Sequence, residues 1–167
     1  MPLYLFANGA FPTTAAQVAV TTGTAIKTML QMKGVTAVQY KIKEWGISFD
    51  GSAADTPIKC ELLETGTVFG TVTAAAAADI VKLDNPANPT STTFFSVGTS
   101  ATGYTCTSEG SITASRMFDV QFVAPTNQYV KQFPLGQEPL VDAVSALRIR
   151  VTAGTAVNAY CYVIVEV

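Results

Sequence analysis

The chain has 167 residues, a length typical of one domain, and its composition is 49 % hydrophobic but only 13 % charged. It contains no histidine, which excludes Ser-His-Asp and Cys-His catalytic sites and imidazole metal ligands. Its net charge is −2, and Lys27 is the first charged side chain, which argues against a nucleic-acid-binding protein with a basic arm. No stretch approaches the roughly 20 apolar residues that span a membrane.

The N-terminal residues 1–17 are neutral and contain two prolines and an Asn-Gly pair. They lack the basic region and apolar core of a signal peptide. We therefore expect an irregular N-terminal arm that becomes ordered by lying on a neighbouring molecule. Residues 18–167 show no linker or repeat and are expected to form a single domain.

From residue 18 onward the chain returns to short runs of alternating apolar and polar residues, the pattern of half-buried strands. In residues 24–33 the side chains of Ile26, Leu30 and Met32 share one face, with a helix as the competing interpretation. Further strands are expected at residues 38–49, 58–62, 67–73, 93–97, 104–108, 112–123, 128–133, 147–151 and 158–167.

The strand at residues 38–49 changes phase along its length. Tyr40 and Ile42 are apolar at even positions, whereas Trp45 and Ile47 are apolar at odd positions. Because a one-residue shift exchanges the two faces of a strand, we predict a β-bulge near residues 44–46. The alternative is a strand buried on both faces near Trp45.

Residues 74–83 interrupt the alternating pattern with five consecutive alanines. Alanine has the highest helix propensity, Thr73 can act as the N-cap, and Asn85-Pro86 would end a helix. The sequence therefore predicts one short surface helix in a connection between strands.

In residues 112–123 we expect Phe118, Val120 and Phe122 to face the core. Asp119, which alternates with them, would then face solvent. The final strand, residues 158–167, is apolar on both faces, which predicts a central position in a sheet or burial by a partner.

Two pairs of basic residues are spaced two positions apart, Lys41 with Lys43 and Arg148 with Arg150. This spacing places each pair on one face of a strand, where we expect the side chains to be solvated. The three cysteines, Cys60, Cys106 and Cys161, show no metal-binding spacing and are expected to be free thiols. Cys60 and Cys161 lie in apolar strand patterns and are expected to be buried, whereas the pattern does not determine the exposure of Cys106. Taken together, the elements predict an all-β protein, an antiparallel β-sandwich with one short helix.

Five segments carry a resemblance to a known group of proteins: residues 44–51, 61–67, 124–139, 147–153 and 158–163. Together they resemble small virion structural proteins of tailed bacteriophages. The resemblance implies a capsid decoration, or cement, protein of jelly-roll type. Such proteins form trimers on the outer surface of the head and clamp the shell. The resemblance carries over no catalytic residue, metal or cofactor, so we expect a protein that is not an enzyme.

The expected partners are the major capsid protein of the same phage and two further copies of the chain, with assembly in the host cytoplasm and no contact with nucleic acid or membrane. We expect the partner interface to use apolar side chains of the arm and exposed aromatic residues, although ordinary core packing is the alternative for each. These candidates are Leu3, Tyr4, Phe6, Phe11, Tyr129, Phe133, Tyr160 and Tyr162.

Three other functions are compatible with the sequence. One is a different virion role, such as a head-fibre base, a tail component or a minor capsid subunit. The second is a jelly-roll capsid protein that packages nucleic acid, against which the neutral N-terminus argues. The third is a carbohydrate-binding adhesion module, for which Trp45 and Tyr129 are the aromatic residues to test.

Overall fold

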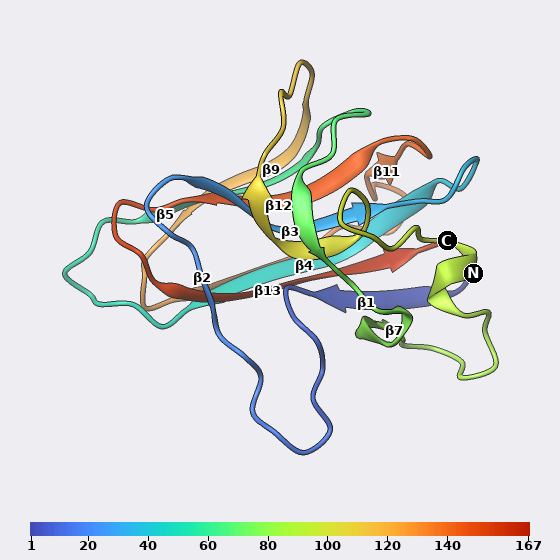
Figure 1. Cartoon of the computed structure of the whole chain (residues 1–167), viewed down its shortest axis with the longest axis horizontal. Coiled ribbons are helices and arrows are strands. Elements are labelled where there is room, and N and C mark those ends of the chain that lie inside the picture. The colour runs from blue at the N-terminus through green and yellow to red at the C-terminus, as the bar shows by residue number, and fades with distance from the viewer.

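The computed structural model describes residues 1–167 and is built almost entirely of antiparallel strands (Figure 1). Two single-turn 3-10 helices, η1 and η2, are its only helical elements. In chain order the elements are β1 (Leu3–Ala7), β2 (Val20–Thr21), β3 (Ile26–Lys33), β4 (Tyr40–Phe49), β5 (Ile58–Glu64), β6 (Thr71–Ala74), η1 (Ala77–Asp79), β7 (Ile80–Lys82), η2 (Ser91–Thr93), β8 (Gly103–Ser108), β9 (Arg116–Val123), β10 (Gln128–Gln132), β11 (Leu140–Val141), β12 (Ala146–Thr152) and β13 (Asn158–Glu166).

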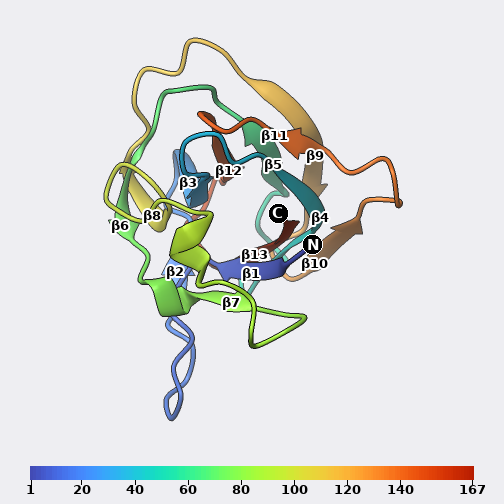
Figure 2. The same ribbon diagram turned by 90° about the vertical axis from the view of Figure 1, so that its right-hand side faces the viewer.

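The strands form two sheets, which we call sheet A and sheet B. Sheet A has the order β10-β4-β13-β1-β7, with β11 also paired to β4 and β2 also paired to β13. Sheet B has the order β6-β8-β3-β12-β5-β9. Figure 2 looks at the molecule end-on and shows the strands of both sheets arranged around one interior.

Eight strands pair in a nested order along the chain. β1 pairs with β13, β3 with β12, β4 with β10, and β5 with β9. The first and last strands therefore lie side by side, and Leu3 is opposite Glu166. Two further pairings, β4 with β13 and β5 with β12, join these hairpin-like pairs into the two sheets.

A single cluster of 27 buried hydrophobic residues lies between the sheets. Sheet A contributes the inward-facing side chains of β1, β4 and β13, and sheet B contributes those of β3, β5 and β12. The prediction of an all-β, antiparallel protein is confirmed, as is the central position of the last strand between β4 and β1. Cys60 and Cys161 are free and buried, as predicted, and Cys106 is also free and buried.

The predicted phase change in β4 is confirmed as a β-bulge. Ile164 pairs with Glu44 and Val165 pairs with Ile42, so Lys43 is the additional residue on β4. The bulge lies one residue before the predicted range. It allows Ile42 and Trp45 to face the same core although they are three positions apart.

Two further bulges overturn predicted strand faces. Phe118 is the additional residue on β9, and beyond it Asp119 faces inward while Phe122 is 71 % exposed. Met29 is the additional residue on β3, and Ile26 is consequently on the solvent face. In each strand the side chains before and after the bulge follow opposite parities, which a single alternating pattern cannot describe.

The predicted helix at residues 74–83 is wrong. The alanine run contains the end of β6 and the single turn η1, and Ile80–Lys82 form β7 on the edge of sheet A. Ile80 packs into the core and pairs with Phe6. Burial of this β-branched side chain beside β1 therefore overrides the local helix propensity of the alanines.

The predicted N-terminal arm is wrong for its first half. Residues Leu3–Ala7 are β1, an inner strand held between β13 and β7, and Tyr4 and Phe6 are fully buried. The second half does leave the body of the protein. Residues 9–19, which we call the projecting loop, extend away from both sheets in two perpendicular views (Figures 1 and 2).

Candidate interaction surface

The projecting loop leaves and rejoins sheet A at nearly the same place. Asn8 extends the pairing of β1 with β13. Its main-chain nitrogen donates to the Cys161 carbonyl oxygen, and its side-chain oxygen accepts from the Cys161 main-chain nitrogen. Val20, where β2 begins, pairs with Ala159. Only one position of β13, Tyr160, separates the two ends of the loop. The loop is therefore an excursion from one continuous edge and is an Ω-loop in character.

Residues 12–19 of the projecting loop are all exposed, and Val18 is 76 % exposed. The loop carries no charged side chain. A segment of this kind adds little to the core, yet ordering its backbone opposes folding. Long loops that persist on a rigid scaffold are commonly the segments that contact other molecules.

A hollow of about 460 Å³ lies where the projecting loop meets sheet A. Phe11 and Val18 of the loop line one side, and Tyr160 of β13 lines the other. Asp50 and Asn158 lie at one end, where the Asn158 main-chain and side-chain nitrogens donate to the two oxygens of the Asp50 carboxylate. Sequence reasoning did not single out Asn158. Its pairing with Asp50 depends on the close approach of β4 and β13.

Two aromatic side chains lie in line on the outer face of sheet A. Tyr160 and Tyr162 are half-buried, and their ring centroids are 6.2 Å apart with an interplanar angle of 34°. Tyr162 lies over Gly46 of β4, where a Cβ atom would come within 2.6 Å of the ring. The Tyr162 hydroxyl donates to Glu44. Burial is the main cause of a raised pKa of Tyr162, and the hydrogen bond to Glu44 raises this pKa further. The glycine and the carboxylate together hold the ring flat on the sheet.

The structure separates the other predicted interface residues. Tyr4 and Phe6 face the core, so they are unsuited to a partner interface. Tyr129 packs partly against the core and donates a hydrogen bond to the inward-facing Asp119. Leu3 and Phe133 line a second, smaller hollow on the rim of sheet A. Phe11 and Tyr160 are thus brought together at one hollow, and Leu3 and Phe133 at another.

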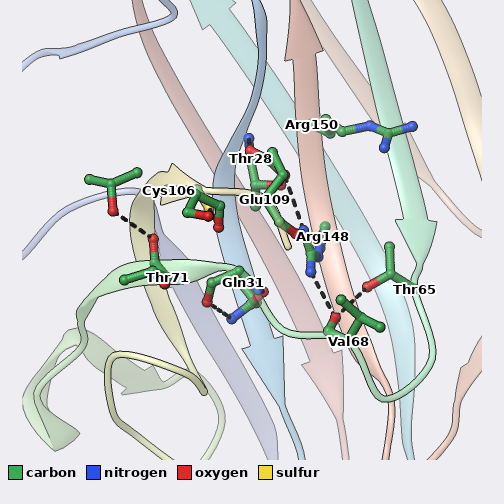
Figure 3. Close-up of polar contacts among 12 residues, drawn as sticks. Thr28, Gln31, Thr65, Val68, Thr71, Cys106, Glu109, Arg148 and Arg150 are labelled. Atoms are coloured by element: carbon green, nitrogen blue, oxygen red, sulfur yellow. Dashed lines mark hydrogen bonds and ion pairs between the residues drawn. The ribbon is translucent and has the colours of Figure 1, made fainter. Parts of the chain in front are cut away.

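The most buried charged side chain lies on the opposite side of the molecule, on the outer face of sheet B. Arg148 is fully buried there, which corrects the prediction of a solvated strand face. Its guanidinium donates to the main-chain carbonyl oxygens of Val68 and Glu109 and to the Glu109 carboxylate. Figure 3 shows Glu109 between Arg148 and Thr28. The main-chain nitrogen and the hydroxyl of Thr28 both donate to the Glu109 carboxylate.

Two more buried carboxylates are held by structural partners. Glu61 accepts hydrogen bonds from Arg150 and pairs with Lys59 on the outer face of sheet B. Asp119 accepts from the Trp45 indole at 3.2 Å and from the Tyr129 hydroxyl at 3.0 Å. These contacts join neighbouring strands and join the two sheets, so both buried carboxylates have a structural role.

The buried carboxylates predict an acid-sensitive fold. Burial would raise the pKa of Asp119, but hydrogen bonds from Gln121, Lys131 and Tyr129 outweigh it, so the pKa lies below the ordinary aspartate value of 3.8. The ionised form therefore stabilises the fold above about pH 4, and this contribution is lost as the pH falls through the lowered pKa. We expect the melting temperature to drop as the pH falls below about pH 4.

Thermal unfolding followed by circular dichroism from pH 6 to pH 2 tests this expectation. The Asp119→Asn variant, which cannot ionise at this position, should show a shallower loss of melting temperature on acidification. A variant curve that runs parallel to the wild-type curve would show that Asp119 does not contribute.

Comparison of the chain with protein-family models, with curated proteins and with solved structures finds no match. The structure has no helix with the length and apolar character needed to cross a membrane. The candidate interaction surface is therefore defined by its own geometry: the projecting loop, the hollow beneath it and the line formed by Tyr160 and Tyr162.

Proposed function

We propose that the chain is a capsid decoration protein of a tailed bacteriophage, with a jelly-roll β-sandwich fold. Three copies form a homotrimer, which binds the major capsid protein on the outer surface of the head. The trimer stabilises the shell and is not an enzyme. It would assemble in the host cytoplasm, where its three free cysteines remain reduced.

The nested strand pairing is the observation that carries this proposal. When a long antiparallel ribbon is rolled over itself, the first strand pairs with the last, the second with the last but one, and so on inward. The pairs β1 with β13, β3 with β12, β4 with β10, and β5 with β9 follow this scheme. Viral capsid domains are prominent users of the jelly roll, together with lectins and cupins.

The projecting loop supports an assembly role, because fold alone does not define function. It is neutral, exposed and anchored at both ends to β13, which presents it from a rigid support. In a shell of repeated subunits each contact needs only moderate affinity, because symmetry multiplies the number of contacts. A neutral loop that inserts between neighbouring capsid subunits fits this requirement.

Excision of residues 10–19, with Gly9 joined to Val20, tests the proposal. The two ends are separated by one position of β13, so the variant should keep the wild-type circular dichroism spectrum. Co-sedimentation with expanded capsids of the phage that encodes the protein should be lost, while the intact protein should co-sediment and raise the disruption temperature of those capsids. Full retention of capsid binding by the variant would remove the loop from the proposal.

Two measurements separate decoration from the other virion roles. Labelling of virions with an antibody against the protein, viewed by electron microscopy, should decorate the whole head surface. Label confined to a vertex or to the tail would instead assign a fibre base or a tail component. Light scattering of the purified protein should give the mass of a trimer, and a monomer at micromolar concentration would contradict the homotrimer.

A further inference from the structure

The outer face of sheet A carries a strip of side chains whose chemistry the proposed capsid contact does not use. The strip follows β13 from the hollow at Asn158 through Tyr160 to Tyr162. Side chains two residues apart on a strand are separated by about 6.6–6.8 Å, so the two tyrosine rings form consecutive steps along one line. Both side chains are partly exposed, so a ligand on this face can reach them.

Polar groups flank this aromatic line at both ends. Asp50 and Asn158 lie beside the hollow, and Glu44, which accepts a hydrogen bond from Gln132, lies beside Tyr162. The Tyr162 hydroxyl is committed to Glu44, whereas the Tyr160 hydroxyl has no hydrogen-bond partner within the chain. Tyr160 can therefore donate to a ligand in the hollow while its ring provides an apolar surface.

We propose that this strip binds a short neutral oligosaccharide that lies along β13, with one sugar unit in the hollow and the next units over the tyrosine rings. Sugar rings present an apolar C–H face, which packs on an aromatic ring, and a rim of hydroxyl groups, which hydrogen-bond to carboxylates and amides. The structure supplies both kinds of partner, with the two tyrosine rings in the middle of the strip and polar groups at its ends. A hollow of about 460 Å³ lies within the range of roughly 300–1,000 Å³ that is usual for small-ligand sites.

Charge distinguishes this ligand class from the alternatives. Asp50 and Glu44 place a carboxylate at each end of the strip, and the hollow is lined by no basic side chain. A phosphate-bearing ligand would be repelled by both acids. A lipid chain would cover the exposed Asp50 carboxylate with hydrocarbon, which costs free energy because the charged group loses its contact with water.

The structure also relocates the aromatic residues that sequence reasoning assigned to carbohydrate binding. Trp45 is fully buried in the core, and Tyr129 is turned inward toward Asp119. Neither ring can stack on a sugar. A glycan site on this surface must therefore use side chains that point outward from sheet A, and Tyr160 and Tyr162 satisfy that condition.

The test is titration of the purified protein with a panel of di- to tetrasaccharides of glucose, galactose, mannose and N-acetylglucosamine. At least one should bind with a Kd below about 1 mM. Tyr160→Ala should weaken that binding about tenfold, because it removes an aromatic contact and a hydroxyl. Phe122→Ala is the matched control, since it also removes an exposed aromatic ring but lies on the outer face of sheet B, and it should leave the Kd within about twofold.

The possible outcomes separate cleanly. A panel with no binding overturns the proposal, as does equal binding by wild type and Tyr160→Ala. If Tyr160→Ala does not fold, Asp50→Ala replaces it, because Asp50 is exposed directly after β4 and its substitution should weaken binding by a similar factor. Capsid co-sedimentation is measured independently of saccharide binding. A protein that binds no saccharide can still bind capsids, and a protein that does not bind capsids can still bind a saccharide.

Discussion

Deletion of residues 1–7 is expected to prevent the chain from forming a stable native state. The deletion removes β1, which lies between β13 and β7 in sheet A, and leaves both neighbours with unpaired main-chain groups. The purified variant should give a circular dichroism spectrum without a cooperative thermal transition, whereas the full chain should melt cooperatively.

The magnitude follows from two side chains. Tyr4 and Phe6 are fully buried, and truncation of one large buried aromatic residue to alanine costs about 3–5 kcal/mol. Two such losses equal most of the roughly 5–15 kcal/mol by which a domain is stable. Loss of the β1 hydrogen bonds to β13 adds to this cost.

Excision of the projecting loop is the matched control for this deletion. It removes a similar number of residues from the adjacent part of the chain, but it takes no side chain from the core cluster. The excised protein should melt within a few degrees of wild type. A deletion variant lacking residues 1–7 that still unfolds cooperatively near the wild-type temperature would contradict the inner position of β1.

Replacement of Glu109 by alanine is expected to lower the free energy of unfolding by about 3 kcal/mol. The substitution leaves the fully buried Arg148 without its charged partner and removes the acceptor for the Thr28 main-chain nitrogen. Breaking a buried ion pair from one side is strongly destabilising, because the remaining charge is desolvated without compensation. Denaturation with urea, followed by circular dichroism, measures the change.

A double variant distinguishes an uncompensated charge from a general disturbance of packing. Arg148→Met combined with Glu109→Ala removes both charges and should recover a large part of the stability lost by Glu109→Ala alone. Glu109→Gln keeps the shape and should lie between wild type and Glu109→Ala. If the double variant is as unstable as the sum of the two single variants, the pair is not energetically coupled.

Strand positions were predictable where the apolar residues alternate without interruption. Residues 58–62 and 147–151 fall within β5 and β12, and residues 128–133 fall almost entirely within β10. The phase change around Trp45 also revealed the bulge in β4, because apolar side chains mark the core-facing side both before and after it. The residues in these segments carry enough information locally.

The bulges at Met29 and Phe118 are not accompanied by a visible phase change in the apolar pattern of the sequence. In β9 the residues before and after Phe118 are a mixture of apolar and polar side chains, so the pattern fits a regular strand with Phe122 inward. The structure has the opposite orientation because Trp45 and Tyr129, which belong to other strands, hydrogen-bond to Asp119. That choice depends on neighbours distant in the chain.

The interaction surface shows the same division. Tyr160 and Tyr162 were predicted as candidates from their aromatic character, and Phe11 from its position near the N-terminus. The hollow that joins Phe11 to Tyr160 arises only when the projecting loop folds back to β13, and the Asp50–Asn158 pair beside it forms only when β4 and β13 pair. The distinction between the core-facing Tyr4 and the surface-lining Phe11 likewise required knowledge of which segment becomes a strand.

The sequence by itself determined the all-β character, the antiparallel strand segments, the burial of Cys60 and Cys161 and the bulge in β4. These features depend on local alternation and composition, which act over a few residues. The tertiary structure decided which faces of β3 and β9 are buried, that the alanine run yields an edge strand and that the N-terminus is an inner strand. The physical reason is that hydrogen bonds and burial shared between distant strands exceed the small local preferences of the chain.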